Sequence, residues 1–285
     1  MNKTYFCFPN FKTKALTLSY DDGVRQDKRL ISIMKKHGIK GTFNINGGMF
    51  GTEYTGEEKG RMTKQEALDL YLPSGMEVAI HGYKHYSLAR VDTSLAINDV
   101  VTDRNELEGM FNQVITGMAY ANGSYNDEVV ELLKKMGVTY SRTVTATENF
   151  EIPTDYLRLP TTCHHNNPKL MELAKQFVEI DTTRYWATQL KLFYLWGHSY
   201  EFDTNDNWQV IEEFCEYMGN REDIWYATNI EIISYLQALE TLTFSMDGSM
   251  VKNPSGIDLY INYTGTQCLV PAGKTVKIKT GEVLN

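Results

Sequence analysis

The chain has 285 residues, 42% of them hydrophobic and 22% charged, which suits one large globular domain or one domain with a small appendage. Its formal net charge of −8 leaves no basic footprint for nucleic acid, so nucleic acid is not an expected partner. No run of residues approaches the roughly 18 apolar positions of a membrane span, and a membrane is not an expected partner either.

The cysteines and the N-terminal segment bear on the cellular compartment. Cys7, Cys163, Cys215 and Cys268 are scattered without Cys-x-x-Cys spacing, so we expect free, mostly buried thiols rather than a thiolate zinc site. The first 18 residues lack a long apolar core and a small-residue cleavage site, and they predict no signal peptide. These features favour a cytoplasmic protein, although a secreted chain trimmed of its leader would look the same.

Strand and helix patterns alternate over the first 240 residues. In chain order they predict a strand at 14–20, a helix at 26–38, a strand at 39–46, a helix at 63–75, a strand at 76–82, a helix at 93–111, a strand at 114–121, a helix at 126–137, strands at 138–144 and 192–198, a helix at 208–220, a strand at 224–229 and a helix at 230–239. Such alternation predicts an α/β fold with a parallel sheet and helical crossovers.

The number of strands favours a distorted (β/α) barrel of about seven parallel strands, a TIM-like barrel, over an open sheet, although periodicity alone does not separate the two. No glycine-rich phosphate loop follows the first strand, which weighs against a dinucleotide-binding fold. After Thr241 the pattern changes to period two, with turn signals at Asp247-Gly248 and at 271–273. We therefore predict a barrel domain at 1–240 and a small antiparallel β appendage at 241–285.

Two adjacent carboxylates, Asp21 and Asp22, stand where the first predicted strand ends, in the sequence LSYDDGV. A surface turn is one interpretation, since Asp-Gly pairs form turns readily. In parallel α/β folds, however, active sites gather at the carboxyl ends of the strands, and His81 and His198 also stand at such ends. Three strand ends with protonatable or metal-binding groups predict a catalytic site at this edge.

His81 and His85 form an H-x-x-x-H pair. If the chain turns helical after Ile80, the i, i+4 spacing places both imidazoles on one face, which suits two nitrogen ligands of one divalent ion. Asp22 could supply a third, anionic ligand. We expect zinc first, but cobalt, nickel, manganese and iron accept the same ligands.

This ligand set leaves Asp21 with a separate task. Because a bound metal would largely neutralise Asp22, Asp21 can stay ionised and take a proton from the attacking water. His198 could protonate the leaving group from the opposite side. An imidazole hydrogen-bonded in the core is the alternative for His198 considered alone.

These residues carry a family resemblance. LSYDDG resembles the T-F-D-D-G motif of the polysaccharide deacetylase family (NodB homology, carbohydrate esterase family 4), and SGMEVAIHGYKH resembles its G-H-E-I-x-x-H-[ST]-x-x-H motif. The resemblance is strong over Ala15–Leu88, weaker to about Leu239, and absent from the tail. It implies a distorted (β/α) barrel, a divalent metal and hydrolytic removal of acetyl groups. By motif position it implies that Asp21 is the general base, that His198 is the general acid, and that the metal ligands are Asp22, His81 and His85.

The third family motif departs from its usual R-P-P-Y-G form. Ala119 stands where the arginine belongs and Asn122 where the tyrosine belongs, closer to an A-Y-P-Y-G variant of the family. The family arginine orients the base, and we expect Arg158, in DYLRLPTT, to replace it; a surface arginine is the alternative. The backbone N–H of Asn122 can still serve the oxyanion, with Tyr120 beside it as a substrate contact. His164 and His165 are expected to be solvated in a polar loop.

These features together predict a metal-dependent hydrolase of carbon–nitrogen bonds other than peptide bonds, which removes acetyl groups from N-acetylated sugars or polysaccharide. The expected partner is an acetylated carbohydrate. One alternative keeps the chemistry but acts on a small non-carbohydrate amide or acetyl ester. Another is a catalytically silent carbohydrate-binding protein, which the missing arginine motivates and the intact Asp, Asp, His, His set opposes.

Overall fold

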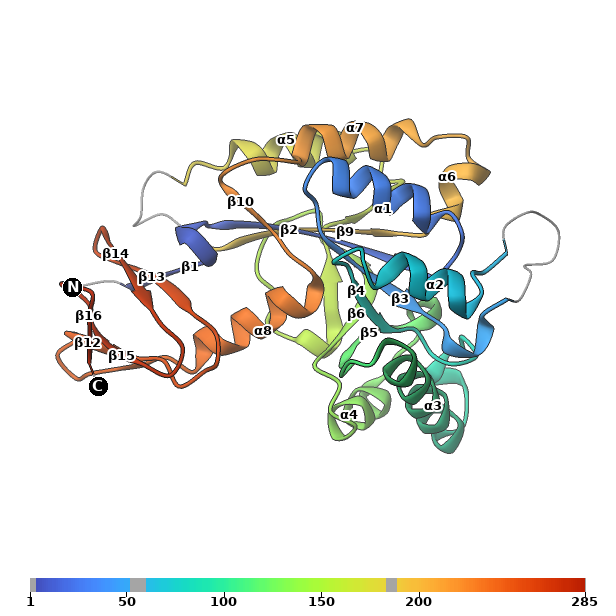
Figure 1. Cartoon of the computed structure of the whole chain (residues 1–285), viewed down its shortest axis with the longest axis horizontal. Helices are drawn as coiled ribbons and strands as arrows, with labels where there is room; N and C mark the ends of the chain where they lie inside the picture. The colour runs from blue at the N-terminus through green and yellow to red at the C-terminus, as the bar shows by residue number, and fades with distance from the viewer. Residues whose placement is uncertain (1–3, 52–59, 183–188, 285) are drawn as a thin grey trace.

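The computed structural model describes residues 4–51, 60–182 and 189–284. Figure 1 shows a twisted central sheet covered by helices, with a small group of strands at one end that holds both chain termini. Among the described helices, none combines the length and the hydrophobicity that crossing a bilayer requires.

The central sheet is parallel and closes on itself. Its strands are β2 (Lys14–Asp21), β3 (Gly41–Ile45), β4 (Glu77–Ile80), β5 (Gly117–Ala119), β6 (Tyr140–Ala146), β7 (Leu159–Thr161), β8 (Cys163–His164), β9 (Lys191–Gly197) and β10 (Ile224–Tyr226). The order is β7-β6-β5-β4-β3-β2-β9-β8, with β10 beside the first half of β2. Since only Thr162 separates β7 from β8, the two ends of this path meet, and seven strand positions form the predicted distorted barrel.

The helices follow the strands, as parallel pairing requires. They are α1 (Asp27–Lys36), α2 (Lys64–Tyr71), α3 (Thr93–Phe111), α4 (Asp127–Lys135), α5 (Leu170–Glu179), α6 (Tyr200–Thr204), α7 (Gln209–Met218) and α8 (Asn229–Glu240). In Figure 1, α1, α5 and α7 cover one side of the sheet, while α3 and α4 lie on the other. Thr63 and Thr228 begin α2 and α8 with complete capping boxes, which satisfy the first backbone N–H groups of each helix.

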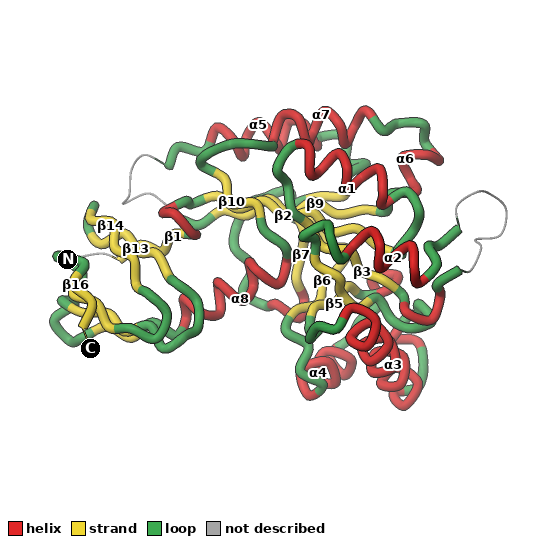
Figure 2. Tube along the Cα trace, viewed as in Figure 1, coloured by secondary structure: helices red, strands yellow, loops and turns green. Residues whose placement is uncertain are grey.

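The appendage is built from two antiparallel sheets (Figure 2). One contains β1 (Thr4–Cys7), β13 (Leu259–Tyr263) and β14 (Thr266–Val270); the other contains β11 (Thr243–Phe244), β12 (Met250–Lys252), β15 (Thr275–Lys277) and β16 (Glu282–Leu284). Helix α8 ends at Glu240, and the division of the chain into two domains there stays a prediction. The appendage nevertheless takes in β1 from the start of the chain, which pairs with β13, a long-range pairing that no local pattern announces.

Candidate active site

Asp21 and Asp22 lie at the end of β2, inside the mouth of the barrel. Each residue is only 2% exposed, so the surface-turn interpretation is wrong. The chain turns sharply here: φ is 85° at Asp22 and 64° at Gly23, a conformation that costs an ordinary side chain energy. A Cβ at Gly23 would lie 2.8 Å from Ile45 Cγ2, so glycine permits both the turn and the close packing against β3.

Asp21 occupies the centre of a charged cluster. One oxygen accepts a hydrogen bond from Asn44 Nδ2 at 2.8 Å, and the other pairs with the Arg142 guanidinium. That second oxygen also lies 3.8 Å from His81 Nε2 and 3.9 Å from His198 Nε2. Burial by itself raises the pKa of Asp21, but the positive charge of Arg142 and the two imidazoles bring the pKa down to about 2. Asp21 is therefore held as a carboxylate.

The arginine beside Asp21 comes from a strand that the sequence interpretation overlooked. Arg142 lies on β6, directly paired in register with Ala119 on β5, the position where the family arginine was expected. Its guanidinium stacks 4.4 Å from the centroid of the Trp196 ring and is fully buried. A charged residue in the middle of a predicted buried strand was the available signal for it.

The expectation that Arg158 approaches Asp21 is wrong. The Arg158 guanidinium pairs with Asp155 at 2.7 Å and with Asp127 at 2.6 Å, at the surface beyond the start of β7. Those two carboxylates are closer partners in sequence and in space. Since Arg142 already neutralises Asp21, no place is left for a second guanidinium there.

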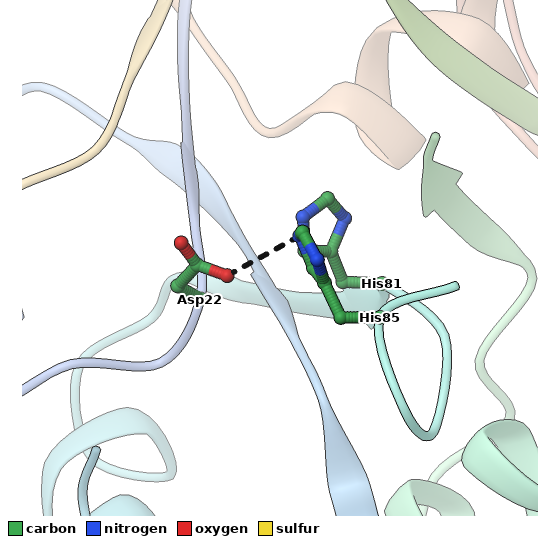
Figure 3. Close-up of side chains that lie close together, drawn as sticks. All are labelled: Asp22, His81 and His85. Atoms are coloured by element: carbon green, nitrogen blue, oxygen red, sulfur yellow. Dashed lines mark ion pairs between the residues drawn. The ribbon is translucent and has the colours of Figure 1, made fainter. Parts of the chain in front are cut away.

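Asp22, His81 and His85 come together as predicted. One donor atom from each lies within 4.8 Å of the others, and His85 Nε2 lies 3.6 Å from Asp22 Oδ1. Figure 3 shows the two imidazoles next to each other and facing the Asp22 carboxylate, with the Asp22–His85 pair marked by a dashed line. His81 Nδ1 lies 2.9 Å from the carbonyl oxygen of Ala119, which can only accept, so the proton sits on Nδ1 and Nε2 keeps its lone pair.

Burial lowers the pKa of both histidines, to about 4 for His85, and so favours their neutral form. Two neutral imidazoles and one carboxylate are the donor set of a divalent-metal site, and these residues fit such an ion.

The histidine pair is brought together by a turn and not by the expected helix. Gly82 and His85 both have positive φ, 83° and 57°. Asp99, from α3, holds the turn by accepting from the backbone N–H of Lys84 at 2.7 Å. Asp103, one turn further along α3, accepts from the N–H of His81 at 3.0 Å. These carboxylates, rather than helical spacing, set the positions of the two rings.

Arg61 is a further buried residue of the site that the sequence interpretation missed. Its Nη2 lies 3.0 Å from Asp22 Oδ1, and its Nη1 donates to the Asp22 carbonyl oxygen and to Asn46 Oδ1. Arg61 therefore offsets the charge of Asp22 and holds the strained backbone of that residue. An arginine inside a segment without strand or helix pattern gave no signal of this role.

Of the remaining predicted residues, His198 and Asn122 lie near the site, whereas Tyr120 is buried away from any substrate. His198, after β9, is partly exposed and faces Asp21, as the acid role requires. Asn122 is exposed in a turn with φ 55°, and its side chain donates to Ser87 Oγ at 3.2 Å, close to the His85 loop. Tyr120 cannot contact substrate as expected: it is 1% exposed, its hydroxyl donates to the Leu157 carbonyl, and its N–H donates to the Arg142 carbonyl.

The comparisons with known proteins match this geometry. The family model described as "Polysaccharide deacetylase" matches residues 9–141, the stretch that contains the two aspartates and the His81–His85 pair. Over this stretch, the chain is similar to the polysaccharide deacetylases. "Putative polysaccharide deacetylase YxkH" of Bacillus subtilis (strain 168) is 22% identical over 125 residues, 44% of this chain and 42% of YxkH. The match therefore spans less than half of that relative.

Two solved structures share the fold of this chain over most of its length. A Mycobacterium smegmatis protein of the same description has a TM-score of 0.56 at 16% identity, covering 86% of this chain and 99% of that one. Puue allantoinase has a TM-score of 0.59 at 13% identity, covering 83% and 94%. At such identities these likenesses show the fold alone, and they confirm the predicted barrel.

Proposed function

We propose that this protein is a metal-dependent hydrolase that removes acetyl groups from the N-acetylated sugars of a polysaccharide. The observation that carries the proposal is the position of Asp21: its carboxylate lies within 4 Å of both His81 and His198, beside the Asp22, His81 and His85 donors. The family match and the name of the Bacillus subtilis relative YxkH support the same activity and substrate class.

Asp22, His81 and His85 would hold the divalent ion, zinc in the first place. When bound, such an ion polarises the acetyl carbonyl and lowers the pKa of a water. The backbone prepares this role by fixing His81 through Ala119 and Asp103, since a ligand whose other nitrogen is hydrogen-bonded presents a defined lone pair.

The proton transfers belong to Asp21 and His198. Asp21 is ionised across the pH range of ordinary enzymes and accepts a proton from the attacking water, while Arg142 and Asn44 hold its two oxygens in place. His198, on the other side of Asp21, gives a proton to the departing amine. The backbone N–H of Asn122 is the proposed donor to the oxyanion, because the turn after β5 adjoins the His85 loop.

A screen of acetate release tests this function. Protein stripped of metal is supplied in turn with zinc, cobalt, nickel, manganese or iron, and offered N-acetylated oligosaccharides, O-acetylated sugars, and small acetyl amides and esters. We expect metal-dependent acetate release from N-acetylated oligosaccharides. Release only from the small compounds would favour the alternative substrate, which the fold shared with an allantoinase keeps open. Sugar binding without any release would instead support the silent binding protein and overturn the proposal.

A further inference from the structure

Behind His198, away from the proposed metal ligands, lies a second polar cluster centred on Glu201 of α6. His198 Nδ1 lies 2.8 Å from Glu201 Oε1. The other carboxylate oxygen, Oε2, receives Asn166 Nδ2 at 2.7 Å and lies 2.9 Å from His165 Nε2 and 3.5 Å from His164 Nε2. The expectation that His164 and His165 are both solvated is wrong, because His165 is 1% exposed and stacks on Phe202 with 4.2 Å between ring centroids.

The cluster has the donor types of a second metal site, but its hydrogen bonding opposes that interpretation. The backbone N–H of Asn166 donates to His164 Nδ1 at 3.1 Å, so Nδ1 carries no proton and Nε2 must carry one. His165 Nδ1 faces the backbone of Gly197, so close that a Cβ there would lie 2.0 Å from it. A protonated Nδ1 would find no acceptor at that point, and the proton of His165 belongs on Nε2, toward Glu201.

The Nε2 atoms of His164 and His165, which lie 3.5 and 2.9 Å from Glu201 Oε2, therefore carry protons. Neither atom has a free lone pair for a metal ion beside Glu201. Burial by itself raises the pKa of Glu201. The opposing effect of His165 and His198 is larger and brings that pKa well below its usual range. The carboxylate is thus a fixed anion with donors on both oxygens. Gly197 contributes by admitting the His165 ring, which any side chain at that position would displace.

We propose that Glu201 is the positioning residue of the general acid: it accepts a hydrogen bond from His198 Nδ1–H and so directs Nε2 toward Asp21. Asn166 anchors Glu201 in turn by donating to Oε2, and His165 Nε2 lies 2.9 Å from the same oxygen. The assignment rests on the proposed function only in that His198 is the acid. When His198 gives its Nε2 proton to the leaving nitrogen, Nδ1–H stays bonded to Glu201, so the ring keeps one tautomer and one orientation throughout.

The effect of Glu201 on the pKa of His198 can be measured separately from that of Asp21, because the two carboxylates lie on opposite sides of the imidazole. Asp21 lies 3.9 Å away on the far side, and the rings of Tyr200 and His164 lie 5.3 and 6.2 Å from the imidazole centroid. Burial lowers the pKa of His198, whereas the hydrogen bond to Glu201 and the charges of Asp21, Asp22 and Glu201 raise it, and the net direction is upward. Removal of the Glu201 charge should therefore lower the pKa of His198 and leave the Asp21 side unchanged.

The test is the Glu201→Gln variant of the zinc-loaded protein. The His198 ring signals are titrated by NMR and assigned with a His198→Asn sample, and kcat/KM is measured against pH. We expect the pKa of His198 to fall by about one unit or more. The basic limb of kcat/KM should move to lower pH by the same amount, with metal content unchanged because Glu201 touches none of the three proposed ligands.

Three further variants complete the test. Glu148→Gln is the matched control: Glu148 is an exposed glutamate bound to Asn167 and Lys169 of the same loop, and its loss should move neither quantity. Glu201→Asp keeps the negative charge, and the pKa of His198 should fall less in this variant than in Glu201→Gln. If Glu201→Gln fails to fold, Asn166→Ala removes one anchor and should give a smaller shift in the same direction.

A His198 that titrates in Glu201→Gln as in the wild type would overturn the assignment. The NMR titration gives this result even if the wild type releases no acetate from any compound. Failure of the positioning role is therefore distinguishable from failure of the proposed function.

Discussion

Asp21 at the mouth of the barrel and Glu77 at its floor are buried carboxyl groups in opposite electrostatic settings. At the mouth, Asp21 is buried against Arg142, and its pKa falls to about 2. At the floor, Glu77, which begins β4, accepts from Thr42 Oγ1 and the Tyr140 hydroxyl, both at 2.7 Å, and from the N–H of Ile230 at 2.9 Å. These floor partners are all neutral, and burial raises the pKa of Glu77 to about 7.

Hydrogen bonds from neutral groups therefore do not offset burial at the floor, whereas one guanidinium does so at the mouth. The floor network ties β3, β4 and β6 to the start of α8, a structural task that a protonated carboxyl group performs equally well. The buried Arg142 beside Asp21 keeps that carboxyl group ionised, which is the form that a general base requires. This contrast separates Asp21, the proposed catalytic carboxylate, from the structural Glu77 more clearly than burial, which the two residues share.

Loss of a mouth ligand should have the largest effect. His81→Ala removes a nitrogen ligand, and the Ala119 carbonyl that holds the imidazole through Nδ1 does not replace that nitrogen. We expect the variant to lose most of its bound metal and nearly all acetate release, as measured by elemental analysis and product assay. His37→Ala, at the end of α1 and outside the site, is the control. Undiminished metal in His81→Ala would rule out this ligand set.

Removal of the positive charge of Arg142 beside Asp21 should have the second-largest effect. Arg142→Gln leaves Asp21 buried without its partner, which typically costs about 3–5 kcal/mol of stability. The pKa of Asp21 should rise, and the acidic limb of kcat/KM should move to higher pH. Urea unfolding at pH 7 measures the loss of stability. The double variant Asp21→Asn/Arg142→Gln should recover part of the loss, and a single variant that loses less than about 1 kcal/mol would remove the basis of the contrast.

At the floor, the sign of the pH dependence is reversed. A carboxyl group whose folded pKa is raised stabilises the fold below its unfolded pKa, and this stability is lost as pH rises from about 4.5 to about 7. Glu77→Gln mimics the protonated form and should reduce the decline in the free energy of unfolding over that interval by on the order of 2 kcal/mol. A remaining decline is expected, since burial also raises the pKa of Asp27 to about 7 and of Asp103 to about 8. An unchanged slope would show that Glu77 is ionised in the fold.

The smallest effect is expected outside both regions. Arg158→Ala removes surface ion pairs to Asp155 and Asp127, which are worth about 0–1 kcal/mol. Activity and its pH profile should stay at wild-type values. A large loss of kcat/KM would bring Arg158 back into the site.

The sequence predicted the alternation of strands and helices because strand and helix periods are local properties, whereas the barrel was favoured by the number of strands and the family resemblance. The helix expected at 93–111 has those bounds in the structure, and the strand at 14–20 differs from β2 by one residue. Helices α5 and α6 and strands β7 and β8 were missed. The two strands are three and two residues long, and β7 contains Pro160, so their pairing depends on neighbours that are distant along the chain.

At the site, the residues of local motifs were placed correctly and those of tertiary origin were not. Asp21, Asp22, His81, His85 and His198 converge as their motifs imply. Arg142 reaches Asp21 through the register of β5 with β6, and Glu201 reaches His198 through the fold of α6 after β9. A charge within a predicted buried strand marked Arg142 as unusual, but the partner of neither residue has a sequence signature, since register and helix orientation are decided by packing.

The central claim is the division of labour between the two adjacent aspartates. The most direct measurement is metal stoichiometry together with kcat/KM against pH for Asp21→Asn and Asp22→Asn. Asp21→Asn should keep its metal and lose about 10²- to 10⁴-fold in rate, because an amide cannot take the proton of the attacking water. Asp22→Asn should lose metal. Near-native activity in Asp21→Asn, with the acidic limb intact, would place the base elsewhere and contradict this account.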